Sequence, residues 1–145
     1  MPSARSSARP VLLDTHAWFW FMSGDRRMDK PALVRLIERA AEHGEAFVSV
    51  MSVWEIGMLE AKGRIRLSCS VFEWVHKAIG EGGIALADLT PDIAVESTRL
   101  EGAQGLDPVD KILIATAKSL GAAFLTRDEA VLSFAKRHLL EAVEI

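Results

Sequence analysis

Residues 106–128 read LDPVDKILIATAKSLGAAFLTRD, and this stretch decides the fold. Asp107 followed by Pro108 is typical of a helix N-cap and first helical residue, and apolar residues then recur at helical spacing until a glycine. The apolar run at 123–126 predicts a short buried strand, and a further acid, Asp128, follows it. A helix that leads into a buried strand, with acids at both ends of the unit, indicates an α/β protein.

Strands and helices are predicted to alternate along the rest of the chain. No two predicted strands are close enough in the sequence to form a tight hairpin. This favours a mainly parallel sheet of four to five strands in an α/β sandwich. The strands are predicted at 11–13, 47–50, 84–87 and 123–126, with a candidate edge strand at 143–145. The helices between them are predicted at 17–22, 31–43, 52–62, 71–79, 90–100, 107–121 and 128–138.

Length and composition indicate one soluble domain. The chain has 145 residues, half of them apolar, so we expect a single domain at 10–145 after a polar, flexible arm at 1–9. A net charge of −3 argues against a strongly basic nucleic-acid binder but is compatible with a local basic groove. A lone cysteine, Cys69, fits the reducing cytoplasm, and no apolar run is long enough to cross a membrane.

Four acids on different predicted elements are the candidates for chemistry. Asp14 follows the first strand, Glu55 lies near the start of the helix after the second, and Asp110 and Asp128 flank the fourth. Ligands of parallel α/β sheets bind beyond the carboxyl ends of the strands, so these acids are expected to converge there. Clustered carboxylates repel each other unless they share a cation, and oxygen ligands suit Mg²⁺ or Mn²⁺. Such a cation supports hydrolysis of phosphodiesters.

Most of these acids also have a structural interpretation. Asp107 is well explained as the N-cap of its helix, which places Asp110 at N3, where the helix dipole favours a carboxylate. Glu55 is equally well placed as the N3 partner of Ser52 in a capping box. Asp128 is suited to cap the last helix. Only the aspartate directly after the first strand lacks an evident structural role in the sequence.

Four motifs together resemble one family. They are Leu12-Leu13-Asp14-Thr15-His16, Ser49 to Ile56 with Lys62-Gly63-Arg64 after it, Asp107 to Lys111 with Ala115-Thr116-Ala117, and Leu125-Thr126-Arg127-Asp128. No single motif is specific, but their order and spacing are. The chain resembles the PIN domains, and among them the VapC-like toxins of prokaryotic toxin–antitoxin pairs, from Val11 to about Phe134.

The resemblance implies a PIN-like α/β/α sandwich and a Mg²⁺- or Mn²⁺-dependent endoribonuclease that acts as a toxin. The acids of the family's catalytic and metal site fall on Asp14, Glu55, Asp110 and Asp128. An additional acid falls on Asp107, and supporting hydroxyls on Thr126, Thr15 and Ser52. Such proteins usually form homodimers and are silenced by a cognate antitoxin protein. One departure is that residues 100–106 contain no histidine, which many relatives carry before the Asp-Pro step.

Contacts to an RNA substrate must come from side chains outside the acid cluster. Basic candidates for binding phosphates are Lys62, Arg64, Lys111 and Arg127, each of which is equally well explained as solvated surface charge. Trp18, Trp20 and Trp54 are able to stack on bases, although packing in the core or a dimer explains them better. Two alternative functions stay open at this point: a catalytically weak domain that acts by binding RNA or a partner, and a nuclease directed at DNA.

Overall fold

A computed structural model describes residues 9–138 and 140–145 of the chain. Most of the predicted arm at 1–9 therefore lies outside the described residues, and the extent of the single domain at 10–145 stays a prediction. The elements, in chain order, are β1 (Val11–Leu13), α1 (Thr15–Ser23), the 3₁₀ helix η2 (Arg26–Met28), α2 (Pro31–Glu42), β2 (Ala46–Ser49), α3 (Val50–Ala61), α4 (Val71–Ala78), the 3₁₀ helix η3 (Glu81–Gly83), β3 (Ile84–Ala87), α5 (Pro91–Ser97), α6 (Pro108–Leu120), β4 (Ala123–Thr126), α7 (Glu129–Arg137) and β5 (Ala142–Glu144).

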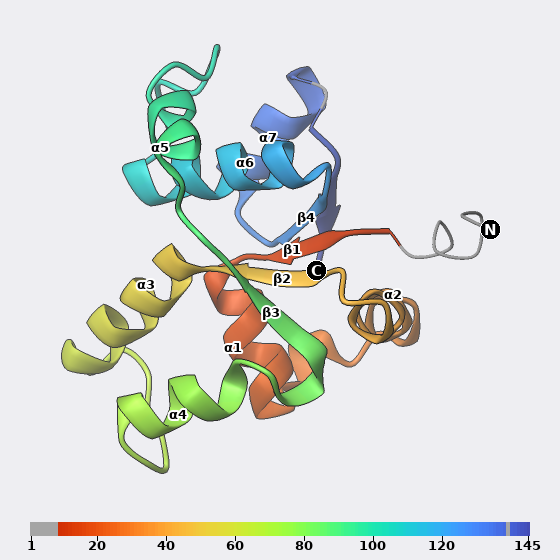
Figure 1. The fold of residues 1–145 in the computed structure, drawn as a ribbon, viewed down its shortest axis with the longest axis vertical. Coiled ribbons are helices and arrows are strands. Elements are labelled where there is room, and N and C mark those ends of the chain that lie inside the picture. Colours follow the sequence, from red (N-terminus) through yellow and green to blue (C-terminus); the bar gives the residue numbers. More distant parts are fainter. Residues whose placement is uncertain (1–8, 139) are drawn as a thin grey trace.

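The strands form one parallel sheet with β1 at its centre. Its order is β3-β2-β1-β4-β5, and each of the four neighbouring pairs is parallel. Leu12 of β1 lies in register with Phe47 of β2 and Phe124 of β4. Helices cover both faces, with α1, α2, α3 and α4 on one side and α5, α6 and α7 on the other (Figure 1). The predicted α/β sandwich is confirmed, with five strands and every pairing parallel.

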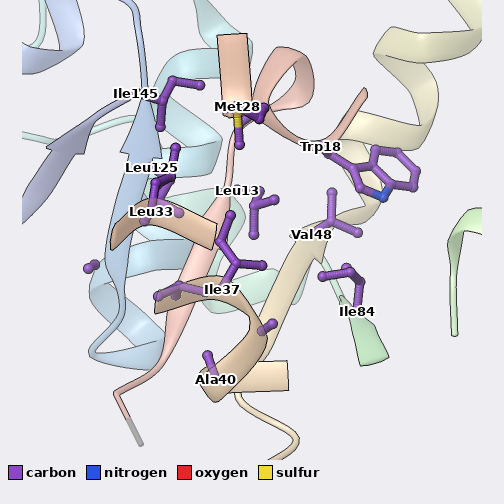
Figure 2. Packing of buried hydrophobic residues seen from close by; sticks show 14 of the residues in the cluster. Leu13, Trp18, Met28, Leu33, Ile37, Ala40, Val48, Ile84, Leu125 and Ile145 are labelled. Carbon is purple, nitrogen blue, oxygen red and sulfur yellow. The ribbon is translucent and has the colours of Figure 1, made fainter. Parts of the chain in front are cut away.

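Alternating residues of β1 divide the core into two layers. Val11 and Leu13 point to the face covered by α1, α2 and α3, where they join a buried cluster with Trp18 and Ile37 (Figure 2). Leu12 points to the opposite face and packs with residues of α6 and α7. All three residues of β1 are fully buried, which is expected of the central strand of a sheet covered on both faces. The strand order therefore places Asp14, the next residue, at the middle of the sheet's carboxyl edge.

The start of α3 differs from the prediction. A helix that begins with a capping box at Ser52 and Glu55 was expected, but α3 starts at Val50 and its N-cap is Ser49, whose hydroxyl accepts the N–H of Met51 at 3.0 Å. The pairing of β2 with β3 ends at Ser49, so the chain turns into the helix there. Ser52 is consequently a buried residue of the first helical turn, and its side chain does not act as the N-cap predicted for it.

Helix α5 is shorter than predicted. It ends at Ser97 instead of Leu100, while its predicted N-terminus, with Thr90 as N-cap, is confirmed. The hydroxyl of Ser97 donates to the carbonyl of Ala94, and that of Thr98 donates to the carbonyl three residues before it. These short-range bonds satisfy carbonyl groups that further helical turns would have used, so the helix closes early.

None of the helices in the described part of the chain is long and apolar enough to cross a membrane.

Candidate active site

A pocket of about 370 Å³ opens at the carboxyl edge of the sheet and collects acids from separate parts of the chain. The residues that line it are Asp14, Thr15, His16, Trp20, Glu55, Asp107, Asp110, Leu113, Arg127 and Asp128. All four predicted site acids and the additional acid Asp107 are therefore brought together. Thr15, one of the three predicted supporting hydroxyls, lines the pocket as well.

Asp14 has both carboxylate oxygens held by the protein. As N-cap of α1, it accepts the backbone N–H of Ala17 on Oδ1 at 2.8 Å, a structural role that the sequence did not reveal. The hydroxyl of Thr126 donates to Oδ2 at 2.6 Å and accepts the N–H of Asp128 at 3.0 Å. Burial raises the pKa of Asp14, and the hydrogen bonds from Thr126 and Ala17 partly oppose that rise. Each oxygen keeps a further lone pair for a ligand.

Glu55 is positioned by a buried pair of hydroxyl groups. Thr15 Oγ1 lies 2.5 Å from Glu55 Oε1 and 2.9 Å from Ser52 Oγ. A hydroxyl carries one proton, so Thr15 donates to the carboxylate and accepts from Ser52. Both hydroxyl residues are buried, with exposed fractions of 2% for Thr15 and 0% for Ser52. The first turns of α1 and α3 are thus tied together, and the α3 carboxylate is directed at the same pocket as Asp14.

The two acids of α6 have different surroundings. Asp107 is exposed and caps the helix by accepting the N–H of Asp110 at 2.9 Å, which confirms the predicted cap. Asp110 is half-buried and faces the other acids. Its pKa is raised to about 7, mostly by burial and then, in decreasing order, by the negative charges of Asp107, Asp128, Glu55 and Asp14. Asp110 is therefore the acid in which the mutual repulsion of the cluster is most evident.

Asp128 is exposed and follows β4 at the rim of the pocket. Its Oδ1 accepts the N–H of Val131 at 3.0 Å, so it caps α7, as one of the two interpretations of the sequence held. Its backbone N–H donates to Thr126, which links the cap to Asp14. Three of the aspartates in the pocket thus start helices, and capping does not prevent them from facing a common space.

The donors in the pocket fit a hard divalent cation in kind. They are carboxylate oxygens, and the raised pKa of Asp110 shows that their charges are not balanced. Within residues 9–138 and 140–145, however, no three acid, histidine or cysteine side chains already form a group that would hold a metal ion. Mg²⁺ usually keeps several waters and takes few ligands from the protein.

Most of the basic residues singled out from the sequence lie away from the pocket. Arg127 lines it, between Thr126 and Asp128. Lys62 and Arg64 are exposed in the turn after α3, and Lys111 is half-buried on α6; none of them lines the pocket.

Two aromatic residues of α1 line the pocket. Their rings, those of His16 and Trp20, are 5.6 Å apart. A spacing of four residues on the helix directly after Asp14 puts both on one helical face, a signal in the sequence that could have placed them. Trp18 is a fully buried core residue, whereas Trp54 is 56% exposed.

Comparisons with known proteins identify the fold's family. The model of the PIN domain family matches residues 11–137. The chain belongs to the PIN domain family. Ribonuclease VapC22 of Mycobacterium tuberculosis is 28% identical over 124 residues, which cover 85% of this chain and 90% of that protein. A solved structure described as a toxin–antitoxin complex from Klebsiella pneumoniae contains a chain with the same fold, with a TM-score of 0.56 and 22% identity over 81% of this chain and 86% of the other.

Proposed function

We propose that this PIN domain is a divalent-metal-dependent endoribonuclease, the toxin of a toxin–antitoxin pair that acts on RNA in the cytoplasm. The observation that carries the proposal is the convergence of Asp14, Glu55, Asp110 and Asp128 on one pocket, with Asp14 and Glu55 held in place by threonine hydroxyls. The relationship to a ribonuclease over most of both chains supports the same activity.

The four acids would hold one or two Mg²⁺ or Mn²⁺ ions. When bound, such an ion lowers the pKa of water and neutralises charge on the leaving oxygen of a phosphodiester. In the hydrolysis, a bond forms between a water oxygen and phosphorus, the bond from phosphorus to one ester oxygen breaks, and that oxygen takes up a proton. The protein does not enter a covalent intermediate.

The side chains contribute orientation and negative charge. Asp14 cannot rotate without losing its bonds to Ala17 or Thr126, so it presents its free lone pairs in one direction. Thr15 occupies Oε1 of Glu55 and leaves Oε2 for a cation or a proton. Positive charge in the pocket would lower the pKa of Asp110, which is about 7 here, and would favour its ionised form.

The first test compares two glutamates of the same helix. Purified protein is incubated with RNA and Mg²⁺ or Mn²⁺, with and without EDTA. We expect cleavage that EDTA stops and that Glu55→Gln abolishes, while Glu60→Gln, an exposed residue of α3 outside the pocket, cleaves like the wild type. Cleavage that survives both EDTA and Glu55→Gln would exclude the mechanism. Digestion of single-stranded DNA in parallel decides whether the substrate is RNA or DNA.

The proposed partners are a cognate antitoxin and a second copy of the chain. Phe72 on α4 and Trp54 on α3 are 76% and 56% exposed, which is typical of residues that a partner covers. If a small open reading frame lies next to the gene, as expected for a toxin–antitoxin pair, expression with and without it tests the antitoxin. Light scattering tests the dimer. Growth inhibition that the neighbour relieves supports the toxin; growth without inhibition in either case, together with RNA binding but no cleavage, supports the alternative of a domain that acts by binding.

A further inference from the structure

Trp20 forms a wall of the acid pocket and is contacted by two arginines. It is half-buried, and the guanidinium carbons of Arg27 and Arg127 lie 4.4 Å and 5.6 Å from its ring centroid. The ring of His16 lies 5.6 Å from it at an interplanar angle of 51°. Trp18, two residues earlier, is fully buried in the core and packs edge-on against another tryptophan. Trp20 packs against the same core cluster, as predicted, and also lines the pocket.

Arg27 is held over the ring by the segment that follows α1. The carbonyl of Trp20 accepts the N–H of Asp25 at 2.9 Å. The carboxylate of Asp25 accepts the N–H of Arg27 at 2.8 Å and lies 3.6 Å from its Nε. Gly24, at φ of 69°, makes the left-handed turn that this return of the chain requires. The arginine is therefore placed by local hydrogen bonds, not by chance contact of a long side chain.

Arg127, one hundred residues after Arg27 in the chain, reaches the same tryptophan from a different segment. Its neighbours on both sides, Thr126 and Asp128, are fixed by hydrogen bonds in the active site. Arg127 is exposed and forms no salt bridge with any residue in 9–138 or 140–145, although acids line the same pocket. A guanidinium that packs on a ring keeps its in-plane N–H donors available, and those donors match the geometry of a phosphate.

Charge explains why a nucleic acid would need such a wall. Five acids line the pocket, and their negative charges repel a phosphodiester. A phosphodiester can therefore approach only where positive charge offsets this repulsion. Among the lysines and arginines of the described residues, only Arg127 lines this pocket. Arg27 does not line it but packs on the ring of Trp20. A strand that enters over Trp20 therefore meets positive charge and an aromatic surface directly beside the acids.

We infer that Trp20, Arg27 and Arg127, with His16, form a nucleotide subsite beside the acid pocket. Arg127 binds a phosphate next to the one that is cleaved, and the His16–Trp20 aromatic pair stacks an unpaired base. The inference rests on the proposed function and deepens it, because it assigns the contacts to one unpaired nucleotide beside the acids to named side chains. A paired base is already stacked in its helix and cannot lie on the ring.

The test measures RNA binding in EDTA, where cleavage does not interfere. A labelled single strand of about ten nucleotides is titrated with the full chain by fluorescence anisotropy at several salt concentrations. We expect Trp20→Leu to weaken binding about tenfold and Trp20→Phe to weaken it less. Arg127→Gln should lower the slope of log affinity against log salt by about 0.7, the change expected from one lost phosphate contact. Arg35→Gln, an exposed arginine of α2 that does not line the pocket, is the matched control and should keep the wild-type slope.

Two controls separate the subsite from simple misfolding and from another ligand. Arg127 is exposed, so its variant should have a wild-type melting curve even if the tryptophan variants do not. Wild-type protein should bind the same RNA weakly when it is a duplex or lacks its bases. Its affinity for these ligands should match that of Trp20→Leu for the intact single strand. Equal affinity of the wild type, Trp20→Leu and Arg127→Gln for the single strand would overturn the subsite. Variants that lose binding to the antitoxin but keep binding to RNA would overturn it as well.

The outcome for the subsite can be distinguished from the outcome for the proposed function. Wild-type protein that cleaves RNA with Mg²⁺ or Mn²⁺, with variants that bind and cleave equally well, would remove the subsite and leave the ribonuclease. Wild-type protein that binds single strands with the expected dependence on Trp20 and Arg127, yet cleaves nothing, would establish the subsite and exclude the ribonuclease.

Discussion

Helices α1 and α6 begin alike, and the difference between their first residues explains the site. Asp14 and Asp107 each accept the backbone N–H three residues on, from Ala17 at 2.8 Å and from Asp110 at 2.9 Å. Asp14 is half-buried and its second oxygen accepts a hydrogen bond from Thr126, whereas Asp107 is exposed. A capping role by itself therefore does not show whether an acid is structural or functional. Asp14 and Asp107 differ in burial and in this second hydrogen bond, and the proposed function assigns the catalytic role to Asp14.

The largest expected difference is in catalysis by Asp14→Asn and Asp107→Asn. Asparagine caps helices as well as aspartate does, so both variants should fold. We expect RNA cleavage to fall by more than about 100-fold in Asp14→Asn, since even the loss of an outer-shell partner typically costs 10- to 100-fold, and to change little in Asp107→Asn. Single-turnover rates with Mn²⁺ measure both. Similar losses in the two variants would show that the α6 cap belongs to the site as fully as Asp14 does.

The second hydrogen bond of Asp14 is tested by removing its donor. Thr126→Val keeps the shape of a fully buried side chain but leaves Oδ2 without the hydroxyl, so we expect cleavage to fall by about 10- to 100-fold. Thr116→Val is the control, because Thr116 is also buried and its hydroxyl donates to a carbonyl within α6. Its cleavage rate should equal that of the wild type. A wild-type rate in Thr126→Val would mean that capping alone orients Asp14.

The structural role of Asp107 is best measured as stability. Asp107→Ala removes the N-cap of α6, and we expect the free energy of unfolding to fall by about 1 kcal/mol in urea titrations. Asp107→Asn should restore most of that loss, because its side-chain oxygen can accept the same N–H. If alanine and asparagine destabilise the protein equally, the negative charge near the helix dipole, and not the hydrogen bond, is what the helix requires.

The last prediction concerns the pH dependence of stability without metal. The pKa of Asp110 is raised to about 7 from 3.8, so between these values the folded state binds more protons than the unfolded state. This group's contribution therefore falls as pH rises through that range and is lowest above pH 7. We expect Asp110→Asn to be more stable than the wild type in EDTA, by a margin that grows from pH 5 to pH 8. Mg²⁺ should reduce the margin at pH 8 by stabilising the wild type.

A margin that is constant with pH would mean that Asp110 ionises as easily in the folded protein as in the unfolded chain. Thermal unfolding in EDTA at matched ionic strength, followed by circular dichroism, provides an independent measurement of the same margin.

Local patterns predicted the elements well because they depend on neighbours in the chain. Pro108 after Asp107 marked the start of α6, and the glycine at 121 marked its end, where φ is 62°. The error at α3 has the same origin. Two serines three residues apart were both suitable caps, and the pattern with Glu55 favoured Ser52. The end of β2 at Ser49 depends on pairing with β3, which no local pattern contains.

The sequence by itself determined which residue types follow each strand, and with them the α/β class and the set of acids, because strand and helix periodicity and capping are short-range effects. Only the tertiary structure decided how those residues meet. The bond from Thr126 to Asp14 spans 112 residues, and the approach of Arg127 to Trp20 spans a comparable length of chain. Such contacts exist because parallel pairing of β1 with β4 brings two distant strand ends to one edge of the sheet. Burial is the main cause of the raised pKa of Asp110, and of the four acids whose charges add to it only Asp107 is a neighbour in the chain; the fold brings the other three there.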